Sequence, residues 1–392
     1  MGQKISVVGR GTVGCLSAAH FLRHSNLEID WVYDPNVPTA AVGEGTSLIF
    51  PKELISLFNW QHTDLIKIKG TVKQGIYKEN WGNGGEFLHP FPIDSVGMHL
   101  SAYDFQDAVF DLISSNPRIN LIEKSVDNDQ QLDSDYVMFC TGSKKELDNN
   151  FLIKNSIPVN SAYVTHCFWD YPRFTYTLTI ARPWGWVFGV PLQHRCAIGY
   201  LFNKDITDLE IIKEDVKEVF SAYNLTPSDK TNHINFNNYC RVDNFNNRTV
   251  YNGNASFFLE PLEATSTGLA AYVNRYAFDV WGGNISSKEA NDWYHKEISD
   301  IESMICLHYL AGSKFKTEFW DYAHDLANEK IEFEFKNKSE FSIFAAASLN
   351  NNSLLFPSGN NIGSWPELSY NINIKKLNLE DKIKLLENKY LS

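Results

Sequence analysis

The sequence predicts an α/β fold that opens with a nucleotide-binding unit of strand, helix and strand. Residues 4–8 (KISVV) form a short apolar strand, and the glycine turn of residues 9–14 (GRGTVG) follows at once. Apolar side chains then recur at helical spacing before a second strand at residues 29–33. Asp34 ends that strand at the roughly 20-residue distance from the last glycine that dinucleotide-binding folds use.

The glycine turn has a definite physical purpose in such a fold. Its glycines let the backbone approach a pyrophosphate, the helix N-terminus presents unpaired N–H groups, and the acid accepts ribose hydroxyls. A tight turn followed by a surface aspartate is the alternative, but strand, helix and acid are all in place. We therefore expect a dinucleotide site, which this pattern alone does not assign to NAD or FAD. The expected contact residues are Gly9, Gly11, Thr12, Val13, Gly14 and Asp34.

The following segments interrupt the α/β rhythm. Residues 71–77 predict a strand, and residues 163–200 predict several antiparallel strands because β-branched and aromatic residues alternate with turn residues. A strand at residues 136–140 ends just before Gly142, which lets the chain pass close beside a cofactor. Other predicted elements are helices at 100–115 and 205–223, a strand at 120–126, a helix after residue 264, a loop at 351–363 and a C-terminal helix. We expect a discontinuous nucleotide-binding module of residues 1–60, 98–160 and 240–300, and a substrate-side module of residues 61–97, 161–239 and 301–392.

Composition and charge exclude several classes. The 392 residues carry 47 acidic against 35 basic side chains, and a net charge of -12 disfavours binding to nucleic acid. No apolar run reaches the roughly 18 residues of a membrane span, and the N-terminal segment lacks the apolar core of a signal peptide. The six cysteines form no CxxC pair, and the histidines show no metal-ligand spacing. We expect a cytoplasmic protein that binds neither nucleic acid nor membrane and holds no metal.

Beyond the glycine turn, the chain carries separated motifs that occur in a fixed order. They are VGEGT at residues 42–46, TVKQGIYKENWG at 71–82, GWVFGVPL at 185–192 and EPLEATSTG at 260–268. In this order they resemble motifs of the flavin-dependent halogenases of the tryptophan-halogenase family. The chain departs from them twice. Phe188 stands where the GWxWxIPL signature has its second tryptophan, and two residues are added before Ser266 in the EPLESTG segment.

The resemblance implies an FAD-binding, Rossmann-like fold of the glutathione-reductase type with an interleaved, mainly antiparallel β substrate region and a helical C-terminal part. It implies reduced FAD from a separate NAD(P)H flavin reductase, a chloride, bromide or iodide ion, and a small aromatic substrate. Lys73 matches the essential lysine that captures hypohalous acid, and Glu263 matches the active-site glutamate beside it. Thr267 and Gly268 match the halide-binding backbone. Further residues assigned to the cofactor are Gly43, Glu44, Gly45, Thr46, Gly142, Trp186, Pro191 and Asn254.

Other interpretations of these residues stay open. Lys73 alternates with Val72 and Gln74, so by itself it predicts a solvated strand lysine, and Glu263 by itself predicts an acid at a helix start. A flavin-dependent aromatic hydroxylase would share the glycine turn, and a flavin-binding regulatory module would have no turnover. The chain is short for the tryptophan-specific members of the family and is more similar to its compact members from bacteriophage and bacteria. This resemblance implies an open pocket with low selectivity among electron-rich arenes.

Overall fold

The computed structural model describes residues 3–38, 43–46, 49–61, 63–82, 85–91, 97–144, 146–342 and 345. The chain forms two compact units, each assembled from three stretches of sequence. The first comprises Met1–Thr71, Met98–Ile153 and Tyr239–Glu297, and the second comprises Val72–Gly97, Lys154–Asn238 and Ile298–Ser392. The predicted α/β class is confirmed, because one unit contains a parallel sheet with helices and the other a largely antiparallel sheet.

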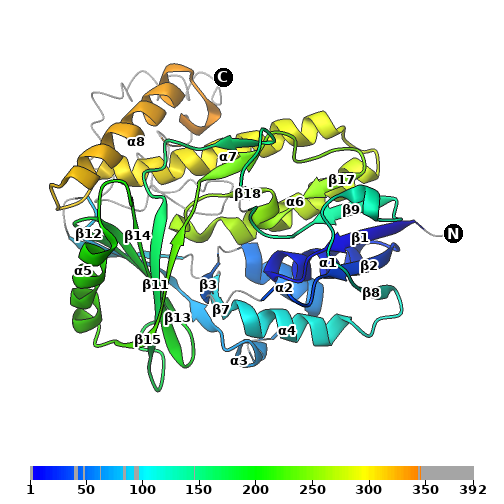
Figure 1. Cartoon of the computed structure of the whole chain (residues 1–392), viewed down its shortest axis with the longest axis horizontal. Coiled ribbons are helices and arrows are strands. Elements are labelled where there is room, and N and C mark those ends of the chain that lie inside the picture. The colour runs from blue at the N-terminus through cyan, green and yellow to red at the C-terminus, as the bar shows by residue number, and fades with distance from the viewer. Residues whose placement is uncertain are drawn as a thin grey trace. The chain divides into compact units, whose positions relative to one another are not determined.

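A five-stranded parallel sheet in the order β17-β9-β1-β2-β8 forms the core of the first unit (Figure 1). Its strands are β1 (Lys4–Val8), β2 (Glu28–Tyr33), β8 (Ile119–Glu123), β9 (Tyr136–Phe139) and β17 (Thr249–Tyr251). The helices of this unit are α1 (Thr12–His24), α2 (Ile49–Phe58), α3 (Asp64–Lys67), α4 (Ala102–Ile113) and α6 (Ser266–Trp281). Helix α1 packs against α4 and α6. Because β1 is the middle strand, the turn that follows it lies at the carboxyl edge of the sheet, where open α/β folds bind ligands.

Short strands and single helical turns complete the first unit. Strand β3 (Gly43–Gly45) pairs antiparallel with β7 (Gly97–Ser101). Strand β4 (Thr71–Lys73) begins in the first unit and ends in the second. A second small sheet contains β10 (Phe151–Ile153), β16 (Tyr239–Arg241) and β18 (Phe257–Phe258). The 3-10 turns are η1 (Asp129–Gln131), η2 (Gly253–Ala255) and η3 (Leu262–Ala264).

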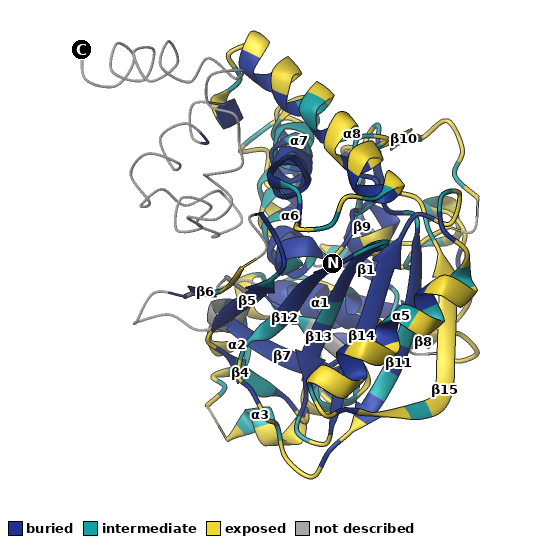
Figure 2. Cartoon of the chain, turned by 90° about the vertical axis from the view of Figure 1, so that its left-hand side faces the viewer, coloured by how far each residue is buried: buried dark blue, intermediate teal, exposed yellow. Residues whose placement is uncertain are grey.

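The second unit is organised by a seven-stranded sheet in the order β15-β11-β14-β13-β12-β5-β6. Its strands are β5 (Gly75–Glu79), β6 (Glu86–Pro90), β11 (Ser161–Phe168), β12 (Thr177–Arg182), β13 (Gly185–Pro191), β14 (Arg195–Phe202) and β15 (Thr226–Asn235). All neighbours pair antiparallel except β12 and β5. Edge strand β15 is exposed along nearly its whole length, unlike the buried strands beside it (Figure 2).

Helix α5 (Leu209–Ala222) covers one face of this sheet through Ile212, Val216, Val219 and Phe220. Val187 of β13 belongs to the same apolar cluster, so its strand neighbours point to the opposite face. Helices α7 (Ser287–Ala311) and α8 (Glu318–Lys336) follow, with α7 beginning in the first unit and ending in the second.

The predicted elements are present among the described residues with shifted boundaries, whereas the sequence pattern predicts no individual elements at α2, β15 or α8. The strand predicted at residues 71–77 is divided at Gln74, whose N–H donates to Thr175 O at 2.8 Å and whose carbonyl accepts from Phe91 N at 2.9 Å. Because its backbone groups make these bonds, Gln74 does not belong to a regular strand, and β4 and β5 are separate strands. The helix predicted from residue 205 begins at Leu209, because Thr207 N donates back to Asn203 O in a preceding turn. The loop and helix predicted beyond residue 350 lie outside the described residues.

Candidate functional site

The glycine turn after β1 is packed so closely that two of its positions accept only glycine. Gly9 has a φ of +116°, and a Cβ there would lie 2.4 Å from Cys140 O. A Cβ on Gly14 would lie 2.1 Å from Gly9 O. Gly11 is different, because a Cβ there would meet no described atom within 4 Å. The turn therefore packs against Cys140, which follows β9, and against its own backbone, and it leaves the backbone at Gly11 open to a ligand.

The start of α1 offers the donors that a pyrophosphate needs. The N-cap residue is Gly11, which has no side chain that could cap the helix, and the helix begins at Thr12. The first N–H groups of a helix have no partner within the helix and carry its positive dipole end. Val13 points away to the η2 turn, where a Cβ on Gly253 would lie 2.9 Å from Val13 Cγ2. These residues fit a dinucleotide phosphate in both space and charge.

Asp34 follows β2 at the same edge of the sheet. Its Oδ1 accepts the backbone N–H of Asn36 at 2.9 Å and the Asn36 side-chain amide at 3.0 Å. These hydrogen bonds hold the pKa of the Asp34 carboxyl below its ordinary value. The group is therefore ionised near neutrality and acts as an acceptor, as binding of ribose hydroxyls requires.

The remaining residues assigned to the cofactor occupy mixed surroundings. Gly142 has a φ of +79° and open space around its Cα, whereas Asn254 is exposed and its carbonyl accepts the Tyr239 hydroxyl at 2.6 Å. Thr46 is buried, and its Oγ1 accepts Met98 N at 2.9 Å. Thr46 thus joins β3 to β7 whatever else it binds. The structure shows that the backbone of Gly43, Glu44 and Gly45 pairs with β7. Contact of these three residues with a cofactor stays a prediction.

Sequence reasoning missed the residue that holds the η2 turn in place. Asn252 is fully buried, and its side-chain amide donates to Ala270 O at 3.0 Å and to Asn274 Oδ1 at 2.9 Å. Its Oδ1 accepts Gly253 N at 2.8 Å. Asn252 therefore fixes the backbone before Gly253 against α6. An Asn-Gly pair at a strand end signals such a turn in the sequence.

The N-terminus of α6, in the same unit, also offers groups that can bind a ligand. Glu263 and Ala264 both have left-handed backbone, with φ of 70° and 54°, and Glu263 is buried. The N-cap residue Thr265 makes no side-chain capping bond. Thr267 is 7% exposed, and its Oγ1 has no hydrogen-bond partner among the described residues. Free N–H groups with an unsatisfied hydroxyl are suited to binding a small anion.

Lys73, at the end of β4 in the second unit, is withdrawn from water. Its side chain is 1% exposed, and its Nζ lies 5.4 Å from the centroid of the Phe91 ring. A lysine so deeply buried is uncommon and costly unless other groups compensate its charge. The interpretation as a solvated strand lysine is therefore wrong.

The aromatic signature on β13 packs within the second unit. Trp186 is 1% exposed, and its indole N–H donates to the Tyr309 hydroxyl of α7 at 3.0 Å. Phe188 lies opposite Gly199 of β14, where a Cβ would be 2.2 Å from Phe188 Cζ. The missing side chain of Gly199 thus makes room for the Phe188 ring. Pro191 ends β13 and is buried.

Lys78 is a second buried amine, and sequence reasoning missed it. Its side chain is 1% exposed, and its Nζ lies 5.6 Å from the Trp81 ring centroid. Its strand neighbour Tyr77 stacks on Tyr176 on the α5 side of the sheet, so Lys78 points to the face opposite α5. Lys78 shares a face of β5 with the buried Ile76, but the alternation of side chains does not by itself tell whether that face meets water or protein.

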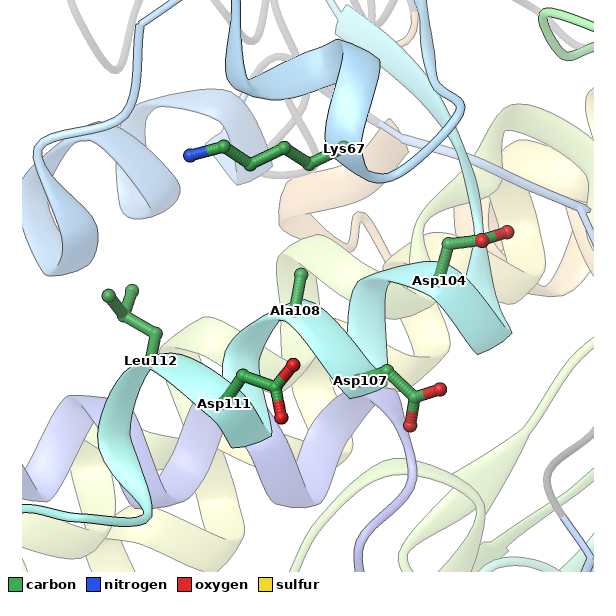
Figure 3. A pocket seen from close by; sticks show the side chains of 6 residues that line it. All are labelled: Lys67, Asp104, Asp107, Ala108, Asp111 and Leu112. Carbon is green, nitrogen blue, oxygen red and sulfur yellow. The ribbon is translucent and has the colours of Figure 1, made fainter.

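Three further observations concern the described residues outside the predicted site. A hollow of about 460 Å³ between α3 and α4 is lined by Lys67, Asp104, Asp107, Ala108, Asp111 and Leu112 (Figure 3). None of the predicted site residues lines it. Among the described residues, His, Cys, Asp and Glu do not gather in threes as a metal site would require. No described helix has the length and apolar character to cross a bilayer.

Comparison with known proteins places these features in context. A family model described as tryptophan halogenase matches residues 4–121 and 113–358. A 7-chloro-L-tryptophan 6-halogenase from a Kutzneria strain is 23% identical over 208 residues, which span 48% of this chain and 39% of the relative. The crystal structure of a tryptophan halogenase from Shewanella frigidimarina has 18% identity and a TM-score of 0.77, over 99% of this chain and 95% of that one. A flavin-dependent halogenase from Xanthomonas campestris has 19% identity and a TM-score of 0.76, also over 99% and 95%.

Proposed function

Because the chain belongs to the tryptophan halogenase family, we propose that it is an FADH2-dependent halogenase acting on small, electron-rich aromatic substrates. The observation that carries the proposal is the burial of Lys73, at 1% exposure beside the Phe91 ring. A solvated lysine would be protonated and surrounded by water, whereas a buried amine can meet an oxidant before water does.

The first unit binds the cofactor through groups that fit a flavin nucleotide. The open backbone at Gly11 and the N–H groups of α1 hold the pyrophosphate, and Asp34 accepts the ribose hydroxyls. When bound, reduced FAD supplies hypohalous acid from oxygen and halide. The Thr267 hydroxyl and the backbone at Gly268 hold the halide at the start of α6.

Lys73 and Glu263 carry the steps that follow. The Lys73 amine hydrogen-bonds the hypohalous acid or takes its halogen, in which case an N–halogen bond forms and the hydroxyl leaves with the amine proton as water. The arene then receives the halogen as an electrophile and loses a proton. Glu263 accepts that proton or polarises the oxidant, and its burial keeps competing water away.

Replacement of each buried lysine by methionine tests the proposal. We expect Lys73→Met to bind FAD and consume oxygen while halogenated product falls roughly 100-fold or more, as loss of a reacting group does. Lys78→Met is the matched control, because Lys78 has the same 1% exposure and methionine fills similar space. The measurement is product mass with reduced FAD, each of chloride, bromide and iodide, and a mixed panel of indoles and phenols.

The outcomes separate the alternatives. We expect several arenes in the panel to gain halogen. Product from Lys73→Met at the wild-type rate would remove Lys73 from the mechanism. Product that gains oxygen and is independent of halide would indicate a hydroxylase instead.

A further inference from the structure

Arg10, the second residue of the glycine turn, has a side chain that the turn itself does not need. Its guanidinium carbon lies 3.7 Å from the centroid of the Phe110 ring and 5.6 Å from that of Tyr33. One guanidinium nitrogen lies 3.0 Å from Asp107 Oδ1 on α4. The two rings meet edge to face at 5.9 Å between centroids. The guanidinium is therefore held in a defined plane by two rings and one carboxylate.

The guanidinium lies near the end of β2, which leads into Asp34. Gly9 N donates to Val32 O at 2.7 Å, which joins the start of the glycine turn to the end of β2. Tyr33 is the last residue of β2 and directly precedes Asp34. The Arg10 side chain, which extends from the turn toward Tyr33, would therefore lie close to the adenosine end of a nucleotide whose ribose binds Asp34.

A stabilising role alone accounts poorly for this arrangement. The Arg10 and Asp107 side chains are 34% and 46% exposed, and an ion pair in water contributes little to folding. Phe110 lies against the guanidinium, and the Arg10 side chain as a whole stays 34% exposed. A planar cation that is ordered by aromatic rings and still partly exposed suits the stacking of a further flat π system.

We propose that Arg10 stacks on the adenine of the flavin nucleotide and thereby sets a preference for FAD over FMN. The inference rests on the proposed function only in that it takes FAD as the cofactor. Asp107 compensates the charge of Arg10, and the nearby Asp34 is ionised, so an additional phosphate gains little there. The stacked group is therefore a neutral purine. FMN carries no adenosine and has nothing to place on Arg10.

Titration of the purified full chain with oxidised FAD, FMN and ADP tests the inference. We expect Arg10→Ala to weaken FAD and ADP about five- to thirty-fold, the range of a cation over a π face, and to leave FMN unchanged. Arg10→Lys keeps the positive charge but lacks the planar guanidinium, so we expect a similar loss of affinity for FAD and ADP. Asp107→Asn removes only the ion pair and should stay near wild type. Arg23→Ala, an exposed arginine of α1, is the matched control.

Each result has a definite meaning. Wild-type FAD affinity in Arg10→Ala overturns the inference and leaves the halogenase proposal standing. An equal loss of FAD and FMN also overturns it, because the turn as a whole would then be damaged. A wild-type chain that binds neither FAD nor FMN overturns both proposals. Should Arg10→Ala fail to fold, Arg10→Lys decides by the same criteria.

Discussion

At the scale of single residues, burial decides which titratable groups are unusual. His20 of α1 is 5% exposed, and its Nδ1 has no hydrogen-bond partner among the described residues. Its ring lies 4.9 Å from that of His24, between centroids. Burial first, and then the nearby His24 and Arg275, lower the pKa of His20 to about 3. The folded protein therefore holds this imidazole neutral.

We expect His20 to make the protein less stable in mild acid. Its pKa is about 3 when folded and near 6.5 when unfolded, so the unfolded chain binds a proton first as the pH falls. Its contribution is complete above pH 6.5 and is lost progressively toward pH 3. Between pH 7 and pH 5 the free energy of unfolding should fall by about 2 kcal/mol more in wild type than in His20→Leu.

Chemical denaturation at the two pH values measures this difference. His324→Gln alters a half-exposed histidine and should keep the wild-type dependence on pH. An identical dependence in wild type and His20→Leu would show that His20 has the same pKa in the folded and the unfolded chain.

At the scale of elements, the turn between β1 and α1 separates folding from binding. Gly14 touches the backbone of Gly9, whereas Gly11 faces open space. The two glycines share one motif but have different physical reasons to lack a side chain. Gly253 resembles Gly14 in this respect, because Val13 fills the space where its Cβ would be.

Alanine at each glycine distinguishes these reasons. We expect Gly14→Ala to lose roughly 1–3 kcal/mol of stability or more, because its Cβ would overlap Gly9 O. Gly11→Ala should melt as wild type but bind FAD about tenfold more weakly or worse, because its Cβ occupies the path of the pyrophosphate. Thermal unfolding and FAD titration measure the two effects. Undiminished FAD binding in Gly11→Ala would place the pyrophosphate elsewhere.

At the scale of the whole molecule, the chain enters each of its two units three times. Glu263 and Thr267 belong to the first unit, and Lys73, Lys78 and Trp186 belong to the second. The glycine fingerprint occurs once in the sequence, in the first unit. One fingerprint serves one nucleotide, so we propose that a separate flavin reductase delivers the reduced cofactor.

Turnover assays with different sources of electrons check this proposal. NADH or NADPH with FAD should give no halogenated product, and addition of a flavin reductase should restore it. Chemically reduced FAD should replace both the nicotinamide cofactor and the reductase. Product from NADPH and FAD alone would mean that this chain reduces its own flavin.

Local pattern alone was enough to predict the nucleotide-binding unit. The strand at residues 4–8, the turn of 9–14 and the strand ending before Asp34 all match the structure, because side-chain alternation and the φ of glycine act between near neighbours. The division of residues 71–77 could not be predicted in this way. It depends on hydrogen bonds of Gln74 with Phe91, just after β6, and with Thr175, far along the chain.

The sequence by itself determined the glycine turn, the acid after β2 and the motifs that place the chain in its family. Only the tertiary structure decided that Lys73 and Lys78 are buried and that Phe188 lies on Gly199. A lysine in an alternating strand has the same local pattern whether its face meets water or protein. Which of the two it meets depends on elements far along the chain, such as α7, whose Tyr309 accepts the indole N–H of Trp186 on the same sheet.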